Sequence, residues 1–222
     1  MATTTYRATN GSEDGYTEFT GATYTPDSGA TAYNGGVLLG VSWDLDGATY
    51  RVQQSFFVFD LTSPTTGDAP AVGSTINSAT LNLYLVEHGS EARTIDVYAY
   101  DWGATLALAD HRTIAQLQTL YDSGNGLVAS YNIPGGWGGA EGNHDFTSGT
   151  AAESAVETAI GSTLRLIMVG ASYRAGTTPT NRGYASFAAA DDTTESHRPL
   201  LTIDHSPPPG FTGLTVTRLL NG

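Results

Sequence analysis

Acidic side chains at short spacing are the first candidates for chemistry in this sequence. Asp44 and Asp46, directly before a glycine, match the opening of an EF-hand calcium loop, but the loop's later ligands and closing glutamate are missing. Asp191, Asp192 and Glu195 form a second acidic group. Each group also fits an ordinary turn of an acidic protein. The sequence therefore leaves calcium open as a cofactor and indicates no other.

Aromatic side chains are the candidates for binding a sugar ring, since ligand sites are rich in aromatic surface. Trp137 stands between two pairs of glycines, a setting that favours exposure, and Trp43 is the second candidate. Tyr98 and Tyr100 share one face of a predicted strand, where an aromatic ladder that only stabilises the sheet is the alternative. Trp102 ends the same strand, and we expect it in the core.

No motif in the chain indicates an enzyme. The five histidines are scattered, without the short spacings of zinc ligands. The nucleophile elbow, the P-loop and the dinucleotide fingerprint are all absent from the sequence. A pair of glycosidase carboxylates would meet only in space, so the sequence leaves that arrangement open. We expect a protein without catalytic activity.

The amino-acid composition limits the classes of partner that this protein is expected to bind. The chain has 222 residues, no cysteine, and a formal charge of −13 in which every basic residue is arginine. Nucleic acids and anionic membrane surfaces need clustered cations, so both are disfavoured. No apolar run approaches the roughly 20 residues of a membrane span. The first residues lack an apolar segment, so no signal peptide is expected.

Two long strands, over residues 50–61 and 76–87, organise the predicted fold. Side chains alternate between the faces of each strand, which is typical of half-buried strands in an antiparallel sheet. We expect one face of each strand to lie in the core, with the side chains Phe57, Phe59, Leu81, Leu83 and Leu85.

The remaining segments predict more strands and two short helices. Strands are expected at residues 93–102, 164–173, 184–190 and 199–205. One helix is predicted over residues 110–122, capped by Asp110, and another begins with a capping box of Thr150 and Glu153 and ends at Gly161. Eight or more irregularly spaced strands favour an all-β fold, a two-sheet antiparallel jelly-roll β-sandwich with two short connecting helices.

Four segments resemble the DNRLRE-type jelly-roll modules, which are similar to carbohydrate-binding modules. They are V-L-L-G-V; S-F-F-V-F-D-L with S-T-I-N-S-A-T-L-N-L-Y; H-D-F-T with L-R-L-I-M-V; and F-A-A-A-D-D-T-T-E-S-H-R-P-L-L-T-I-D-H. Together they cover about residues 37–205, and the sequence departs from the family pattern between Asp101 and Asn143. The resemblance implies a non-catalytic module of secreted or surface proteins, some of which bind polysaccharide.

The sequence predicts a jelly roll over residues 1–205 and a proline-rich linker with a docking arm over residues 206–222. Three prolines at 207–209 cannot donate backbone hydrogen bonds, so the chain should leave the sheet there. The apolar side chains of the arm, which we expect to contact another chain, are Phe211, Leu214, Val216, Leu219 and Leu220.

Two roles follow from this organisation. The first is a non-enzymatic structural protein on the surface of a phage virion, decorating the head or associated with the tail. Its partners would be capsid or tail subunits, further copies of itself in a homo-oligomer, and surface glycans. The alternative is a carbohydrate-binding module of a secreted or cell-surface protein.

Overall fold

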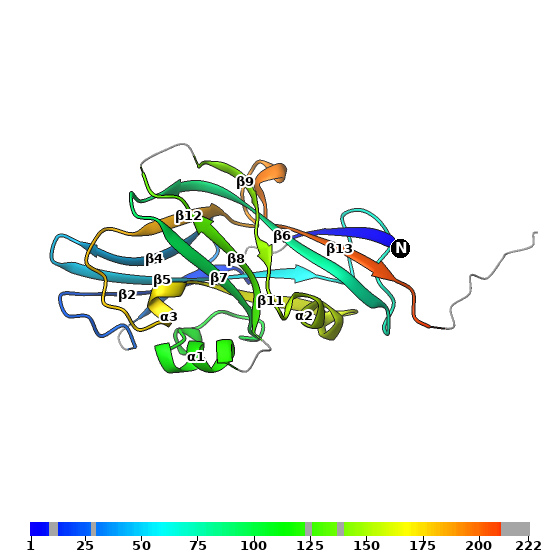
Figure 1. Ribbon diagram of the computed structural model, residues 1–222, viewed down its shortest axis with the longest axis horizontal. Helices are drawn as coiled ribbons and strands as arrows, with labels where there is room; N and C mark the ends of the chain where they lie inside the picture. Colours follow the sequence, from blue (N-terminus) through cyan, green and yellow to red (C-terminus); the bar gives the residue numbers. More distant parts are fainter. Residues whose placement is uncertain (9–12, 28–29, 123–125, 137–139, 210–222) are drawn as a thin grey trace, which may run out of the picture.

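A computed structural model describes residues 1–8, 13–27, 30–122, 126–136 and 140–209 (Figure 1). Strands hold 47% of the residues and helices 14%, so the all-β class is confirmed. The strands are β1 (Ala2–Arg7), β2 (Gly15–Gly21), β3 (Thr31–Asn34), β4 (Leu38–Asp46), β5 (Thr49–Asp60), β6 (Thr75–His88), β7 (Arg93–Ala99), β8 (Leu127–Ile133), β9 (Gly142–Asp145), β10 (Thr147–Ser148), β11 (Thr163–Gly170), β12 (Tyr184–Ala188) and β13 (Leu200–Ser206). The helices are α1 (Ile114–Asp122), α2 (Ala152–Ala159) and α3 (Ala171–Arg174), with 3-10 turns at Leu108–Asp110 and Glu195–His197.

All pairings between these strands are antiparallel, and they form one curled sheet. Its order is β1-β13-β6-β12-β4-β5-β11-β7-β8-β10, with β2 and β3 attached through the pairing of β2 with β5. The curl follows from the segment that contains β9 and β10. Within a few residues of chain, β9 pairs with β6 and β10 pairs with β8, so this segment links two distant parts of the sheet order.

An inner core fills the concave side of the curled sheet. The long strands β5 and β6 are not hydrogen-bonded to each other, but the five side chains predicted for the core all lie in it, as expected. Helix α2 adds three further side chains and so covers one end of this core. Members of the inner core include Phe57, Phe59, Leu81, Leu83, Leu85, Ile95, Val97, Ala152, Val156, Ala159, Leu166, Met168, Phe187 and Ile203.

An outer core lies on the opposite face of β5, β7 and β11. Helices α1 and α3 contribute Leu117 and Tyr173 to this core, and α1 is seen below the sheet in Figure 1. The sheet is therefore buried on both sides here, which explains why Phe56 and Val58 of β5 are as buried as their neighbours. The outer core consists of Phe19, Val52, Phe56, Val58, Tyr98, Trp102, Leu106, Leu117, Ile167, Val169 and Tyr173.

The first predicted helix starts later than expected. Asp110 ends a 3-10 turn instead of capping the helix. The cap of α1 is formed by Thr113 and Gln116: the Gln116 N–H donates to the Thr113 hydroxyl at 3.2 Å, and the Thr113 N–H donates to Gln116 Oε1 at 2.9 Å. This is a reciprocal capping box, and it satisfies two of the free N–H groups at the start of the helix.

The other helices also correct the prediction. Helix α2 lies where expected, but its N-cap is Ala151, without a side-chain hydrogen bond, so Thr150 and Glu153 do not form the predicted box. The strand expected to continue to Tyr173 ends at Gly170, and α3 follows it. We attribute the early end of β11 to tertiary packing, because α3 places Tyr173 in the outer core, where it is fully buried.

The buried residue Asp14 joins three separate segments of the chain through its side chain and its backbone. Asp14 is 1% exposed, and its Oδ2 accepts a hydrogen bond from the Ala190 N–H at 3.0 Å. The Asp14 backbone carbonyl accepts the Gly35 N–H at 2.8 Å. Burial raises the pKa of Asp14 to about 6, and the bond from Ala190 opposes part of that rise.

Leu83→Asp should lower the free energy of unfolding by at least about 3 kcal/mol, because the new carboxylate would lie in the inner core without a partner. Val86→Asp, on the opposite face of the same strand and only half-buried, should cost at most about 1 kcal/mol. Urea denaturation followed by tryptophan fluorescence measures both changes. Equal losses in the two variants would contradict the observed faces of β6.

Asp14→Asn should stabilise the protein at neutral pH. Folding raises the pKa of Asp14, so the folded state binds the proton more tightly, and this contribution is lost as the pH rises from about 4 to about 6. Asparagine keeps an acceptor for the Ala190 N–H and carries no charge. The variant's gain over the natural chain should therefore grow across that window to about 1–3 kcal/mol and stay constant above it. Urea titrations at pH 4, 5, 6 and 7 test this, and a gain independent of pH would rule out the ionisation of Asp14 as its cause.

Candidate functional site

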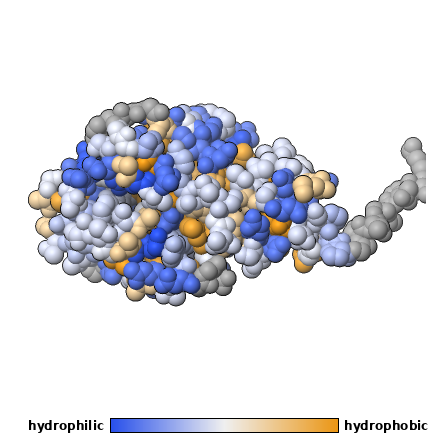
Figure 2. All heavy atoms as spheres, viewed as in Figure 1, coloured by the Kyte–Doolittle hydropathy of each residue, from blue (hydrophilic) through white to orange (hydrophobic). Residues whose placement is uncertain are grey.

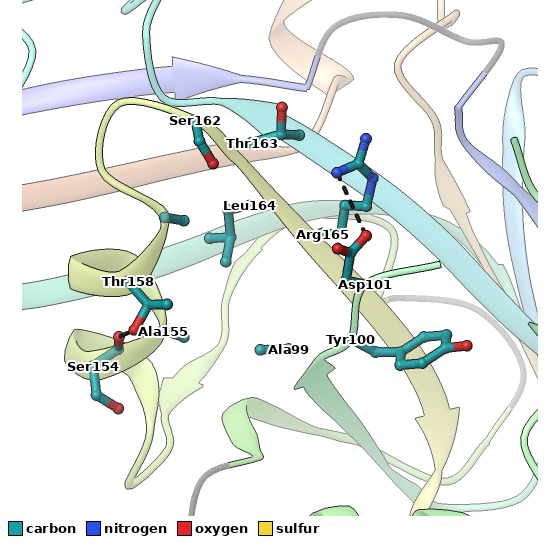
Figure 3. A pocket seen from close by; sticks show the side chains of 11 residues that line it. Ala99, Tyr100, Asp101, Ser154, Ala155, Thr158, Ser162, Thr163, Leu164 and Arg165 are labelled. Carbon is teal, nitrogen blue, oxygen red and sulfur yellow. Dashed lines mark hydrogen bonds and ion pairs between the residues drawn. The ribbon is translucent and has the colours of Figure 1, made fainter. Parts of the chain in front are cut away.

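An open groove lies between α2, the end of β7 and the start of β11. The face seen in Figure 2 is mostly polar, with small apolar patches between polar residues. The groove has a volume of about 600 Å³, and Figure 3 shows its walls. It is lined by Ala99, Tyr100, Asp101, Ser154, Ala155, Thr158, Ala159, Ser162, Thr163, Leu164 and Arg165.

Hydroxyl groups from α2 and the following turn form one wall. Ser154 and Thr158 are four positions apart on α2, so they share one face of the helix (Figure 3). The Ser154 hydroxyl donates to the Ala151 carbonyl at 3.2 Å, and the Thr158 hydroxyl donates to the Ser154 carbonyl at 2.8 Å. Both oxygens keep lone pairs, so this wall offers hydrogen-bond acceptors to a ligand. Ser162 and Thr163 extend the wall towards β11.

An arginine held by two carboxylates forms the other wall. One terminal nitrogen of Arg165 lies 3.6 Å from Asp101 Oδ1, the ion pair drawn in Figure 3, and the other lies 3.4 Å from Glu13 Oε2. The guanidinium centre is 5.9 Å from the ring centre of Trp102, within range of a cation–π contact. Glu13 also binds the arginine from a distant part of the chain. Arg165 is therefore fixed in position, while Asp101 remains largely exposed beside it.

A smaller hollow of about 220 Å³ lies on the other side of Tyr100, against α1. The Tyr100 ring points away from α2 and towards this hollow (Figure 3). Its hydroxyl donates to Asp110 Oδ1 at 3.2 Å, and the Arg112 guanidinium lies 4.2 Å above the ring centre and donates to the same hydroxyl. Burial raises the pKa of Tyr100. Arg112 thus occupies one face of the ring, so a sugar could stack only on the other.

The structure does not bring the predicted aromatic platform together. Tyr98 is fully buried in the outer core, its hydroxyl donates to Asp96 at 3.1 Å, and burial raises its pKa. No face of the Tyr98 ring is open to a ligand. Trp43 is half-buried and lines a separate narrow hollow, and its indole N–H donates to the Thr177 carbonyl at 2.7 Å. Trp137 lies outside the described residues. Trp102 lies in the core, as predicted.

Asp44 and Asp46, the two candidate calcium ligands, lie in different environments. Strand β4 continues to Asp46, and the turn is formed by the next two residues, where Gly47 has a positive φ of 63°. Asp44 is completely buried, neither of its oxygens has a hydrogen-bond partner, and burial raises its pKa. Asp46 is half-exposed and pairs with Arg182 at 3.7 Å. Within the described ranges, no three His, Cys, Asp or Glu side chains come together as metal ligands do.

Two members of the second acidic group, Asp192 and Glu195, are bound by the chain's own residues. Asp192 accepts the Thr194 N–H at 2.7 Å and lies 3.7 Å from His197. Glu195 pairs with Arg7 at 3.5 Å. These contacts fit a surface loop stabilised from within.

The predicted docking side chains, Phe211, Leu214, Val216, Leu219 and Leu220, all lie outside the described residues. The described part ends just after β13, whose last residue Ser206 pairs with Thr75. Pro208 then passes near Gly73, where an added Cβ would lie 3.8 Å from the proline ring. The N-terminus and the end of β13 lie at the same end of the molecule, on the right in Figure 1.

Tyr100 is the one lining residue of the groove that the sequence indicated as a site residue, and the other lining residues were not predicted. The pair Ser154 and Thr158 was readable as an i, i+4 hydroxyl face of the predicted helix. The contact of Arg165 with Glu13 joins residues 152 positions apart, and no local pattern signals it. The comparison with protein-family models found no match, and the comparison with curated proteins found none either. No helix in the described part of the chain has the length and apolar composition needed to cross a bilayer.

Proposed function

We propose that this chain is a non-enzymatic interaction protein whose groove beside α2 binds carbohydrate. The observation that carries the proposal is the pairing of Arg165 with the exposed Asp101, opposite the hydroxyl face of α2. Each sugar hydroxyl can donate one hydrogen bond and accept another at the same time. A guanidinium and a carboxylate side by side match two neighbouring hydroxyls, and charge-assisted hydrogen bonds of this kind are strong.

The jelly-roll sandwich is the finer description of the fold that we propose. One group of strands, β6, β12 and β13, turns Leu83, Phe187 and Ile203 into the inner core. A second group, β5, β7 and β11, turns Phe57 and Leu166 into the same core from other parts of the sheet order. Strand β12 is hydrogen-bonded to β4, and β4 is hydrogen-bonded to β5, so β4 joins the two groups. Two groups of strands that face one core support the proposal of a β-sandwich.

The carboxylates of the groove favour binding over hydrolysis. A glycosidase needs two facing carboxyl groups with different protonation states. Asp101 is the one carboxylate among the described residues that line the groove, and it is paired with Arg165. The arrangement suits an acceptor that orients a ligand.

We further propose the surface of a phage virion as the setting, in the head or tail, with a secreted or cell-surface location as the alternative. The observation that favours docking on a neighbouring chain is the end of the molecule where β1 and β13 meet. Met1 is 89% exposed at this end, and Val72, next to the glycine that Pro208 approaches, is 80% exposed. Exposed apolar side chains beside the exit of the chain suit a contact with a capsid or tail subunit or a second copy.

Arg165→Gln should weaken glycan binding at least tenfold, because it removes the charged donor and releases Asp101. A glycan array on the full chain identifies the ligand, and calorimetry with the strongest neutral oligosaccharide measures the change. Arg182→Gln is the matched control, since it removes the same charge from an ion pair far from the groove. Absence of binding to any glycan, or an equal loss in both variants, would refute the proposal.

Truncation after Ser206 should leave the domain folded and abolish assembly. The inner core and the β1–β13 pairing lie within the retained residues, so the melting temperature should change by at most a few degrees. Light scattering after size-exclusion chromatography measures the oligomer of the full and truncated chains. A full chain that is monomeric, or a truncated chain that assembles as before, would rule out the docking arm.

A further inference from the structure

A buried threonine and a buried histidine form a hydrogen bond beside the turn that leads into α1. Thr17 on β2 is 0% exposed and His111 is 9% exposed. Thr17 Oγ1 lies 2.8 Å from His111 Nδ1, and the Pro26 carbonyl oxygen lies 2.9 Å from His111 Nε2. A carbonyl can only accept, so Nε2 carries the proton of the neutral ring and the Thr17 hydroxyl donates to Nδ1. A hydroxyl held against the free nitrogen of an imidazole is the arrangement that activates serine and threonine nucleophiles.

The surroundings of His111 suit a general base. Burial lowers the pKa of His111, which keeps the ring neutral at neutral pH, while the bond to Pro26 and the charge of Asp27 oppose the shift. Asp27 is fixed in position, because its Oδ1 accepts the Ile114 N–H at 3.1 Å and the Tyr173 hydroxyl at 3.2 Å. A neutral imidazole with a fixed carboxylate nearby can take up a proton and be stabilised while it holds one.

The side chain opposite Thr17 in the sheet is a carboxamide. The strand register pairs Thr17 with Gln54 on β5, so the two side chains share one face and their Cβ atoms lie about 4.5–5.5 Å apart. Gln54 is 0% exposed. Its Oε1 accepts the Arg112 N–H at 2.8 Å, and its Nε2 donates to the Arg112 carbonyl at 2.6 Å. An N–H on the amide oxygen stabilises the negative charge that develops there when the amide carbon is attacked.

His111 contacts both reacting groups through its two ring nitrogens. Nδ1 is bonded to the Thr17 hydroxyl, and Nε2 lies 3.4 Å from the amide nitrogen of Gln54. One imidazole can therefore remove the proton of the hydroxyl and supply a proton to the departing nitrogen. The side-chain bonds of Gln54 rotate, so its amide carbon can approach Thr17 Oγ1 to the roughly 3–3.5 Å that attack requires.

We propose that Thr17 and Gln54 react to form an ester that links β2 covalently to β5. The Thr17 oxygen bonds to the amide carbon of Gln54 while its proton passes to His111 Nδ1. The carbon–nitrogen bond of the amide then breaks, and the proton on His111 Nε2 passes to the leaving nitrogen. An alcohol and an amide give an ester and ammonia, so the step needs no oxidant, reductant or cofactor. It occurs once in each chain and does not involve the groove beside α2.

Burial favours the survival of such an ester. The reacting side chains are removed from solvent, so water has little access to hydrolyse the product. Ammonia escapes into the solvent and is protonated there at neutral pH, which removes it from the reverse reaction. The link would also fix a peripheral strand, because β2 is attached to the rest of the sheet through β5. The chain has no cysteine, so a disulfide is not open to it for this purpose.

Tryptic digestion of the full chain tests the link. The chain has no lysine, and cleavage after Arg7, Arg51 and Arg93 places Thr17 and Gln54 in two different fragments, residues 8–51 and 52–93. The folded protein is incubated at neutral pH, denatured, digested and analysed by mass spectrometry. We expect one joined fragment, lighter than the sum of the two by one ammonia. Ring closure at an Asn–Gly pair also releases ammonia but leaves the two fragments separate.

Variants of β2 identify the hydroxyl. Thr17→Val removes it at nearly constant shape and should give separate fragments, whereas Thr17→Ser keeps a hydroxyl and should give the joined one. Thr20→Val is the matched control, the same change at an exposed position of the same strand, and it should leave the link intact. Circular dichroism shows whether each variant is folded.

Hydroxylamine provides a test that needs no variant. It cleaves esters and leaves amides intact, so it should split the joined fragment of the natural chain. The proposal is overturned by separate fragments from the natural chain, by a joined fragment that resists hydroxylamine, or by a joined fragment from Thr17→Val. Because the readout is a mass and not glycan binding, failure here is distinguishable from failure of the groove beside α2.

Discussion

Burial of both faces of β5 is the constraint on which the rest of the structure depends. Phe57 and Phe59 lie in the inner core, and Phe56 and Val58 lie in the outer core. Each such side chain contributes about 1.5–3 kcal/mol when it leaves water. A strand with two apolar faces needs a layer on each, which the curled sheet supplies on one side and α1 and α3 on the other. The same burial fixes β11 beside β5 and β7 beside β11, and these two strands carry one wall of the groove beside α2.

The sequence was a good guide wherever a pattern is local. Alternation in β5 and β6 correctly assigned the side chains of the inner core, because the period of a strand fixes its faces. The prediction that β5 is half-buried was wrong, because Phe56 and Val58 on its other face are buried in the outer core. The pattern in β7 was less informative, since Tyr98 and Val97 point to opposite faces and both are buried. The predicted start of the first helix was wrong. The helix α1 is capped by Thr113 and Gln116, whereas Asp110 ends a separate 3-10 turn.

Long-range contacts are what the sequence could not supply. Closure of the sheet depends on β9 and β10, four and two residues long, which pair with strands far from each other in the sheet order. The groove beside α2 depends on the same kind of contact. Tyr100 was recognisable as an aromatic residue near a strand end, but Arg165, which lines the same groove, is placed there by pairings that only the folded chain creates.

Arginine placement links the acidic composition to the groove beside α2. The chain has 22 acidic and 9 basic residues, and six of the eight arginines that the structure describes lie within 4.0 Å of a carboxylate. Arg165 has two such partners, Glu13 and Asp101, and Asp101 is the more exposed of the two. A ligand hydroxyl that replaces Asp101 would therefore leave the guanidinium paired with Glu13, so binding at this wall does not leave a partly buried cation without an anion.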